Sequence, residues 1–267
     1  ELDQGYILAC QSVPQTDIRI AVELAGAQAP RRVSGRILAQ EKLTHDITRL
    51  TVQLEQSLAY KSGQFANISL ESLPGLSRSY SFASRVQPDA KVSFFVRKVP
   101  EGRFSSAIND DGLIGQRMSI EGPLGDFWLR PAEAPLLLVA GGSGLAPLLA
   151  VLQEVVASGV SRSATLLFGA REERDLYALD EIRAIAAQWR GQFRSVPVLS
   201  AVTPDAGWSG ECGLVTERIA SLLEPGTHAY LCGPPGMIDS AVAVLREHGV
   251  APEHIHADRF TTQAASA

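Results

Sequence analysis

The chain has 267 residues, 45% of them apolar and 20% charged, which is the composition of an ordinary soluble globular protein with sizeable cores. Its formal net charge is −5, and no cluster of Lys and Arg is longer than a pair such as Arg31 and Arg32, so a nucleic-acid partner is not expected. The length exceeds the roughly 100–150 residues of a typical domain, and we expect two domains.

Membrane insertion and a disulfide framework are also disfavoured. The longest apolar stretch, residues 135–152, is interrupted by glycines and a proline, so it lacks the roughly 20 unbroken apolar residues of a membrane span. The three cysteines, Cys10, Cys212 and Cys232, are odd in number and far apart. We therefore expect a protein of the reducing cytoplasm without a membrane segment.

The first part of the chain predicts an all-β domain. Residues 1–30 contain too few apolar positions for a core and are interpreted as a remnant and linker. Residues 31–130 contain short alternating strands, such as Thr48–Leu54 and Lys91–Arg97, separated by Gly, Pro and Ser turns. About six such strands indicate a small antiparallel barrel.

Residues 131–267 predict an α/β domain. Buried strands without polar alternation are each followed by a helical stretch, which is typical of a parallel, doubly wound sheet covered on both faces. The expected strands are Pro135–Ala140, Ala164–Phe168, Phe193–Leu199 and His228–Cys232. The expected helices are Leu148–Ser158, Asp180–Trp189, Gly213–Leu223 and Gly236–His248.

The strongest local motif is Leu136–Pro147, a buried strand that leads into a glycine turn and a helix. Glycines let the backbone approach a phosphate, and a helix N-terminus offers unpaired N–H groups to an anion. Pro147 suits the first helical turn, where no N–H is required, although it stands where the usual fingerprint has its third glycine. The motif predicts a dinucleotide site; the alternative is a purely structural turn.

A second segment, Tyr230–Met237, ends a later strand of the same predicted sheet. Ligands of open α/β sheets bind at the carboxyl ends of the strands, so both segments are expected at one crevice. Cys232 stands directly before a Gly-Pro-Pro turn and would be a small, polarizable residue facing that crevice. The alternative is a cysteine that only fills space in the core.

In the predicted barrel, the strand Ser77–Phe82 combines a cation, aromatic rings and hydroxyls. Because side chains alternate across a strand, Arg78, Tyr80 and Phe82 are expected on one face and the intervening serines on the other. An arginine can neutralise a phosphate, and a tyrosine can lie against a flat heterocycle. The alternative is an edge strand with a solvated arginine.

Downstream, Val99–Ala107 is typical of a turn that leads into a short helix. Gly102, Ser105 and Ser106 stand where a pyrophosphate could accept hydrogen bonds from backbone and hydroxyl groups. The alternative is a capped surface helix. The glycines of Gly122–Phe127 indicate a tight structural corner.

Taken together, these motifs resemble the ferredoxin–NADP reductase superfamily in order and spacing, across roughly residues 33–260. The four matching segments are Arg78–Ser81 (R-x-Y-S flavin motif), Gly102–Ser106 (flavin pyrophosphate turn), Gly141–Pro147 (G-G-T-G-x-A-P loop, with Ser143 for Thr) and Cys232–Met237 (C-G-P-P-x-M). The resemblance implies that residues 31–130 are a six-stranded antiparallel Greek-key barrel for FAD. It also implies that residues 131–267 are an NAD(P)-binding domain.

Within that superfamily, the chain most resembles the reductase components of bacterial aromatic-ring dioxygenases of the benzoate and terephthalate types. The similarity is carried by Leu76–Ser81, Gly122–Gly125 and the ending His254–Phe260. In that branch a plant-type [2Fe–2S] ferredoxin domain precedes the flavin domain. Its last ligand lies in a segment similar to Gly5–Gln11.

A plant-type cluster needs four thiolates, three of them in a C-x4-C-x2-C loop, which this sequence lacks. We therefore expect residues 1–30 to include the end of a ferredoxin domain, and no [2Fe–2S] cluster in this chain. Cys10 would be a metal ligand only in the presence of the whole ferredoxin domain. The alternative for Cys10 is a buried thiol.

The resemblance also implies residue roles. FAD would lie across the barrel, with Arg78 against its pyrophosphate, Tyr80 along the isoalloxazine and Ser81 near N5. The candidate catalytic residues are Ser81, Cys232, which faces the nicotinamide, and Phe260, which covers the flavin. Other cofactor contacts fall in the barrel on Ser79, Phe95, Val96, Arg97, Gly102, Arg103, Phe104, Ser105 and Ser106, and in the second domain on Gly142, Ser143, Gly144, Pro147, Arg171, Gly233, Pro234 and Met237.

The choice between NADH and NADPH depends on Arg171, which could meet a 2′-phosphate, and on Asp175, which could accept a ribose hydroxyl. NADH is expected because most relatives of this kind use it, and NADPH stays open. The predicted function is electron transfer from NADH through FAD to a [2Fe–2S] centre. The expected partner is a terminal oxygenase for aromatic rings, or its ferredoxin.

Two other functions stay open at this point. One is a flavin or cytochrome b5 reductase-like enzyme, against which the resemblance around Cys10 argues. The other is a non-catalytic FAD subunit that relays electrons within a complex. The second function needs no nicotinamide site, so the segments Gly141–Pro147 and Cys232–Met237 argue against it.

Overall fold

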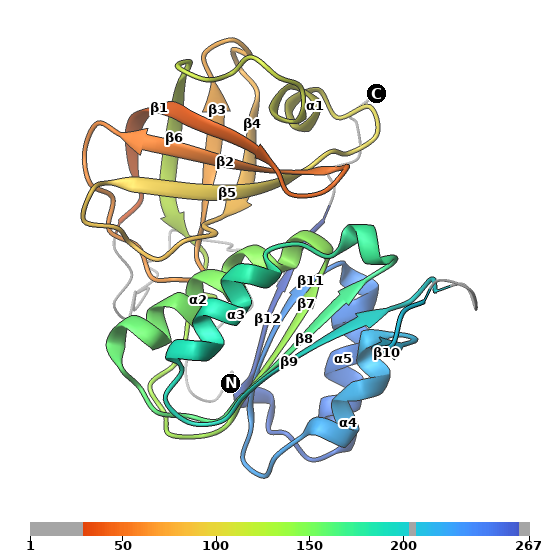
Figure 1. The fold of residues 1–267 in the computed structure, drawn as a ribbon. Helices are drawn as coiled ribbons and strands as arrows, with labels where there is room; N and C mark the ends of the chain where they lie inside the picture. The colour runs from red at the N-terminus through yellow and green to blue at the C-terminus, as the bar shows by residue number, and fades with distance from the viewer. Residues whose placement is uncertain (1–28, 203–206, 262–267) are drawn as a thin grey trace, which may run out of the picture.

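The computed structural model describes residues 29–202 and 207–261, which form two packed units, each built on one six-stranded sheet (Figure 1). The first sheet is antiparallel and the second is parallel. Both predicted fold classes are confirmed. The predicted remnant and its Cys10 lie outside the described residues.

The first sheet has the strand order β4-β3-β6-β1-β2-β5. Its strands are β1 (Arg31–Lys42), β2 (Ile47–Leu54), β3 (Phe65–Leu70), β4 (Ser77–Ser81), β5 (Lys91–Arg97) and β6 (Arg117–Leu124). Buried positions alternate along β2 and β3, so one face of the sheet lines a core. A bridge between Phe82 and Phe94 connects the two edges, so the sheet curls into the predicted barrel.

A short helix, α1 (Arg103–Asn109), closes one end of this barrel. Its last residue, Asn109, is buried, donates to the Val96 carbonyl at 3.0 Å and accepts from the Thr48 hydroxyl at 2.9 Å. These two bonds satisfy a buried amide and attach the helix to β5 and β2. The predicted turn and short helix are therefore present.

The second sheet has the order β10-β9-β8-β7-β11-β12. Its strands are β7 (Leu136–Gly141), β8 (Ala164–Ala170), β9 (Phe193–Leu199), β10 (Glu211–Cys212), β11 (His228–Gly233) and β12 (Ile255–Arg259). The α-helices are α2 (Leu145–Ser158), α3 (Leu179–Gln188), α4 (Ile219–Leu222) and α5 (Pro235–Glu247). Short 3₁₀ helices are η2 (Gly142–Gly144), η3 (Glu173–Asp175), η4 (Val215–Arg218) and η5 (Pro252–His254).

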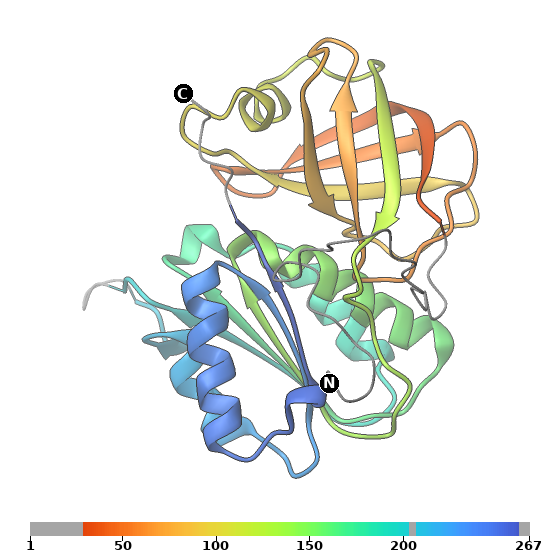
Figure 2. The same ribbon diagram turned by 180° about the vertical axis from the view of Figure 1, so that it is seen from behind.

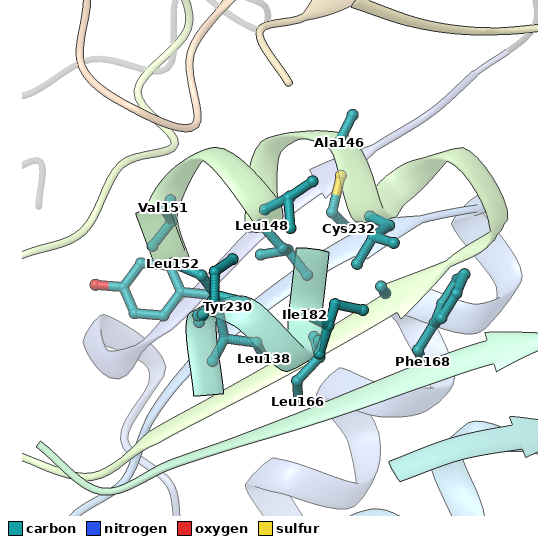
Figure 3. Packing of buried hydrophobic residues seen from close by; sticks show 14 of the residues in the cluster. Leu138, Ala146, Leu148, Val151, Leu152, Leu166, Phe168, Ile182, Tyr230 and Cys232 are labelled. Atoms are coloured by element: carbon teal, nitrogen blue, oxygen red, sulfur yellow. The ribbon is translucent and has the colours of Figure 1, made fainter. Parts of the chain in front are cut away.

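Helices cover both faces of this parallel sheet, as the buried strands require. The helices α2 and α3 lie on the face toward the barrel, and α4 and α5 cover the other (Figures 1 and 2). All six residues of β7 are buried. The core between the strands β7, β8 and β11 and the helices α2 and α3 includes Leu138, Leu166 and Tyr230 (Figure 3).

One predicted helix is shorter than expected. The sequence predicts a helix over Gly213–Leu223, but the structure has the 3₁₀ helix η4 followed by the four-residue α4. Gly213 has φ +104°, which is not helical, and Leu223 is extended one residue before Glu224 and Pro225. Both ends of the predicted helix are therefore lost.

Candidate functional site

The glycine turn between β7 and α2 packs directly on the end of β11. A Cβ on Gly144 would lie 2.1 Å from the Cys232 carbonyl oxygen, and a Cβ on Gly141 would lie 2.5 Å from the Met237 sulfur. Both positions therefore need glycine because another segment approaches closely. The structure thus brings together the two segments that were predicted to face one crevice.

A pocket of about 340 Å³ opens beside this turn, within the range of roughly 300–1,000 Å³ for small-molecule sites. Its lining comes from both units of the protein. The barrel contributes Asp46, Ile47 and Arg97. The α/β unit contributes Gly141, Gly142, Gly169, Ala170, Arg171, Asp175, Val198, Ser200, Gly213, Leu214, Val215, Pro234 and Met237.

Of the predicted dinucleotide contacts, Gly142, Arg171, Pro234 and Met237 line this pocket. Gly144, Pro147 and Gly233 are buried, and Ser143 is half-buried in the same turn. Pro147 is the third residue of α2, as predicted for a first helical turn. Gly144 and Pro147 therefore shape the turn from within, whereas Gly142 faces the pocket.

Two barrel residues that line this pocket, Arg97 and Asp46, form an ion pair. Arg97 Nε donates to Asp46 Oδ2 at 2.8 Å, and a Cβ on Gly142 would lie 3.1 Å from Arg97 Nη1. Burial alone would raise the pKa of Asp46, but the hydrogen bond from Thr44 and the Arg97 guanidinium lower that pKa below its usual value. Asp46 therefore stays ionised, and Arg97 lies beside the glycine turn.

Asp175 of the α/β unit also lines the pocket, and its side chain is 12% exposed. Its Oδ2 accepts from the Glu172 backbone N–H at 3.1 Å and lies 3.5 Å from Arg171 Nε. Its Oδ1 is 3.6 Å from His45 Nδ1 but has no hydrogen-bond partner among residues 29–202 and 207–261. This oxygen is buried beneath the pocket wall and faces His45.

Cys232 is fully buried at the carboxyl end of β11. Burial, and then the nearby Asp258 carboxylate, raise the pKa of the Cys232 thiol well above its usual value. Figure 3 shows its sulfur beside Ala146, on the side of the core that faces the barrel. The side chain is thus a neutral, buried thiol rather than a thiolate nucleophile, and it is not among the residues that line the pocket.

Phe260 follows β12 and lies next to this region. Its backbone N–H donates to the Gly233 carbonyl at 2.9 Å, and its half-buried ring packs against the core cluster that contains Cys232. The structure therefore brings Phe260 and Cys232 together at one sheet edge. A role in covering a flavin stays a prediction.

The predicted flavin-binding strand β4 is an edge strand whose burial increases along its length. Arg78 and Ser79 are exposed, Tyr80 is half-buried and Ser81 is 5% exposed. Phe82, expected on the same face as Arg78, is fully buried and stacks on Tyr60 at 3.8 Å between ring centroids. Exposure to a ligand therefore decreases from Arg78 to Ser81, whose side chain reaches the surface only slightly.

The side chains of β4 differ in how firmly they are held. Arg78 makes one hydrogen bond, to the carbonyl of its neighbour Ser77, and Ser79 donates to Asn67 at 2.7 Å. Tyr80 stacks on Phe104 of α1 at 6.0 Å, and burial raises the pKa of its phenol to about 12. Tyr80 is therefore a fixed, protonated ring, whereas the guanidinium of Arg78 is available to an anion.

Around α1, the predicted pyrophosphate turn is only partly available. The Ser105 hydroxyl donates to the Gly102 carbonyl and accepts from the Val99 N–H, both at 3.1 Å, so Ser105 stabilises the turn. Gly102 and Ser106 are half-buried, and Arg103 is exposed. The groups open to a ligand here belong to Gly102, Arg103 and Ser106.

Two further candidates, Phe95 and Val96, have buried side chains. Val96 is fully buried in the barrel core, and its carbonyl accepts from Asn109 Nδ2. Phe95 points to the other unit and packs edge-on against Tyr177, with ring centroids 5.5 Å apart. Neither side chain is grouped with Arg78 and Tyr80.

Sequence reasoning missed several residues of the site, among them Asp46 in the pocket lining and, next to the pocket, His45 and Tyr177. The first two lie in the turn between β1 and β2, where the Thr44 hydroxyl accepts the N–H groups of Asp46 and Ile47. The turn was predictable from its polar residues, but its contact with the other unit was not. Tyr177 stands in a connecting segment with no motif.

The two sets of residues fit two different ligands. Around β4 and α1, an exposed guanidinium, a fixed aromatic ring and a glycine turn suit a flat heterocycle with phosphates, as in FAD. At the pocket, a glycine turn before a helix, Arg97 and the Asp175 carboxylate suit a dinucleotide with its ribose hydroxyls. Among the described residues, no group of three or more His, Cys, Asp or Glu side chains could hold a metal ion.

In the part of the chain that the structure describes, every helix is too short or too polar to span a bilayer. Comparison with known families gives two matches. Residues 34–128 match the oxidoreductase FAD-binding domain, and residues 138–243 match the oxidoreductase NAD-binding domain.

Two curated relatives align with nearly the whole chain. The xylene/toluene monooxygenase electron transfer component XylA of Pseudomonas putida is 40% identical over 259 residues, covering 96% of this chain and 74% of the relative. The ferredoxin–NAD(P)+ reductase component of the naphthalene 1,2-dioxygenase/salicylate 5-hydroxylase systems of a Ralstonia species is 36% identical, with coverages of 96% and 78%.

Solved structures agree with these relatives. The cytochrome P450 reductase GcoB of Amycolatopsis superposes with a TM-score of 0.80 at 31% identity, covering 87% of this chain and 71% of that protein. The ferredoxin reductase in carbazole 1,9a-dioxygenase superposes with a TM-score of 0.79 at 29% identity, with coverages of 87% and 70%. The arrangement of both units is therefore shared with known reductases.

Proposed function

Because the chain belongs to the family of FAD- and NAD-binding reductases that supply electrons to oxygenase systems, we propose that it passes electrons from NADH through FAD to a [2Fe–2S] centre. The proposed final acceptor is an oxygenase that acts on aromatic rings, reached directly or through a ferredoxin. The proposed FAD domain spans residues 31–130 and the proposed NAD domain spans 131–267.

One observation carries the proposal: a single pocket is lined by the barrel and by the glycine turn. Arg97 and Ile47 come from the barrel, while Gly142 and Met237 come from the two nucleotide-binding segments of the other unit. A dinucleotide held there contacts both units at once. Such shared positioning is what a protein contributes when cofactors carry the redox chemistry.

In the proposed FAD site, the chain supplies charge, a stacking surface and a hydroxyl. Arg78 neutralises the pyrophosphate, Tyr80 packs along the ring system, and Ser81 offers its hydroxyl near N5. Gly102, Arg103 and Ser106 add donors at the phosphates. FAD, when bound, supplies the conversion between two-electron and one-electron transfer.

In the proposed nicotinamide site, Cys232 is a protonated and fully buried thiol, which the nicotinamide would reach only once Phe260 is displaced. Phe260 shields the same end of the sheet from water, and its displacement would open a place for the nicotinamide ring. The turn residues Gly142 and Ser143 offer backbone N–H groups to the pyrophosphate. These residues bind and orient the dinucleotide, and none of them transfers a proton to it.

The proposed preference for NADH rests on Asp175. Asp175 lines the pocket, where its carboxylate can accept a ribose hydroxyl, whereas the same carboxylate would repel the 2′-phosphate of NADPH. Arg171 is the residue that would favour NADPH, but it lies 3.5 Å from Asp175 and is partly neutralised by it. The pair as a whole favours the uncharged ribose.

The proposal is tested by loading the chain with FAD and measuring reduction of a purified plant-type ferredoxin with NADH and, in parallel, with NADPH. We expect ferredoxin reduction that is faster with NADH. Equal rates with both nucleotides would contradict the assignment of Asp175. A flavin that NADH bleaches but that never reduces ferredoxin would contradict the proposed acceptor.

A further inference from the structure

A buried tyrosine outside all predicted motifs contacts the glycine turn. Tyr177 lies between η3 and α3 and is only 4% exposed. Its hydroxyl donates to the Gly142 carbonyl at 2.9 Å, although 35 residues separate the two in sequence. The turn that would hold the dinucleotide is thus attached to a side chain from the next connecting segment.

This hydrogen bond fixes the orientation of one peptide group. The Gly142 carbonyl also accepts the N–H of Leu145, so both of its lone pairs are used. Gly142 has φ +54°, a conformation that other residues adopt rarely. Because a trans peptide is planar, a carbonyl held toward the buried tyrosine directs the N–H of Ser143 to the opposite side, away from the core.

The ring of Tyr177 is itself held from both units. Phe95 of barrel strand β5 and Phe168 of β8 each contact it edge-on, with centroids 5.5 Å away and interplanar angles of 79° and 89°. Arg49 lies over Phe95 at 5.2 Å and pairs with Glu181 of α3. The position of the hydroxyl is therefore set by the barrel as well as by the sheet.

Two further features support this arrangement: the backbone next to Tyr177 is constrained, and the Tyr177 hydroxyl stays protonated. Ala178, directly after the tyrosine, has φ +55°, which is uncommon for a residue with a side chain. Such a conformation persists where the surrounding packing enforces it. Burial raises the pKa of the Tyr177 phenol, so the hydroxyl remains a donor across the working pH range.

We propose that Tyr177 is a positioning residue: it holds the Gly142 peptide so that the Ser143 N–H faces the dinucleotide pyrophosphate. Through its contact with Phe95, it also couples the position of this turn to barrel strand β5. The inference rests on the proposed function, because it assigns the turn to a dinucleotide. Tyr177 contacts neither cofactor and acts only through the backbone. Its loss should weaken nucleotide binding while FAD binding is unchanged.

The test compares Tyr177→Phe with Tyr60→Phe in the FAD-loaded chain. Tyr60 is a matched control because it is also buried, at 8% exposure, and its hydroxyl also donates to a backbone carbonyl, Ser84, at 2.9 Å. Calorimetry with NAD+ should give binding about tenfold weaker for Tyr177→Phe, the upper end of the usual effect of one lost hydrogen bond, and unchanged binding for Tyr60→Phe.

A second readout does not depend on nucleotide binding. Hydrogen–deuterium exchange of the peptide that contains Gly142 and Ser143 should be faster in Tyr177→Phe and unchanged in Tyr60→Phe. An unchanged NAD+ affinity in Tyr177→Phe, or equally weakened NAD+ binding in both variants, would overturn the role of Tyr177 but not the proposed function. A parent chain that binds no NAD+ would overturn the proposed function, and this inference with it.

Discussion

The two proposed cofactor regions are built in opposite ways. At the glycine turn, the backbone is closely packed: Gly144 lies against Cys232, Gly141 against Met237, and Tyr177 holds the Gly142 carbonyl. Around β4, Arg78 is exposed and bonded only to its neighbour's carbonyl. The dinucleotide region is therefore set by packing before a ligand arrives, whereas the flavin region depends on side chains that a ligand can order.

This difference has a physical consequence for substitutions. In a preformed backbone site, the most damaging change is an added atom, because the turn cannot move away from its neighbours. In a side-chain site, the most damaging change is a removed charge. The predictions below use this contrast, beginning with the largest expected effect.

Gly144→Ala should nearly abolish nucleotide binding. The new Cβ would lie 2.1 Å from the Cys232 carbonyl oxygen, which is backbone and cannot rotate away, so the turn must shift. Displacements of this size cost on the order of a hundredfold in reactions that depend on alignment. The measurement is NADH affinity of the FAD-loaded variant. FAD retention is the internal control, and parental NADH affinity would show that the turn is not rigid.

Arg78→Ala should lose FAD during gel filtration, with affinity weakened about 30-fold, as expected for one charge-assisted phosphate contact. Arg36→Ala is a matched control, because Arg36 is also an exposed barrel arginine that donates to one backbone carbonyl, that of Gly115. It should retain FAD. Full retention by Arg78→Ala would remove β4 from the flavin site.

Asp175→Asn should raise the efficiency of NADPH relative to NADH about tenfold, because it removes a negative charge from the pocket wall and leaves Arg171 without a counterion. The ratio of kcat/KM values for the two nucleotides measures this. Glu173→Gln removes an exposed charge from the same 3₁₀ helix, outside the pocket lining, and should leave the ratio unchanged. An unchanged ratio in Asp175→Asn would separate this carboxylate from ribose recognition.

Asp258→Asn should stabilise the protein slightly at neutral pH. Burial, and then the nearby Asp126 charge, raise the pKa of Asp258, so the fold disfavours its ionised form. A raised carboxyl pKa costs stability once the pH exceeds it, and the cost vanishes below the unfolded pKa. The Tm at pH 7 should rise by about 2 °C.

The gain in Asp258→Asn should shrink as the pH falls toward the acid range. Asp111→Asn, at an exposed loop position, should show no gain at any pH. A Tm that falls at pH 7 in Asp258→Asn would mean that the ionised carboxylate stabilises the fold. In that case its surroundings supply a partner for the charge.

Much of the fold was predictable because its elements carry local signals. Strands β5 and β9 have the predicted bounds, and the glycine turn lies where its sequence places it. Helix α4 was overestimated, since Gly213 and the bend before Pro225 outweigh the apolar pattern. Local sequence patterns thus predict that a helix or strand is present more reliably than they predict where it begins and ends.

The site was predictable only where a single segment carries it. Gly142 and Met237 were found from their motifs, and Arg97 was predicted as a cofactor contact of the barrel; all three line the pocket beside the glycine turn. Asp46 and Tyr177 were missed because their roles depend on contacts with residues far away in the sequence, Arg97 and Gly142. Tertiary contacts of this kind leave no local periodicity or spacing.

The most direct test of the whole account is an anaerobic titration of the FAD-loaded chain with NADH, following the yellow absorbance of the flavin. If the FAD site of the barrel and the NADH site of the α/β unit face each other, one equivalent of NADH should bleach the flavin absorbance completely. A chain that holds FAD and binds NADH but keeps its colour would contradict the account, because the two cofactors would then occupy sites that do not meet.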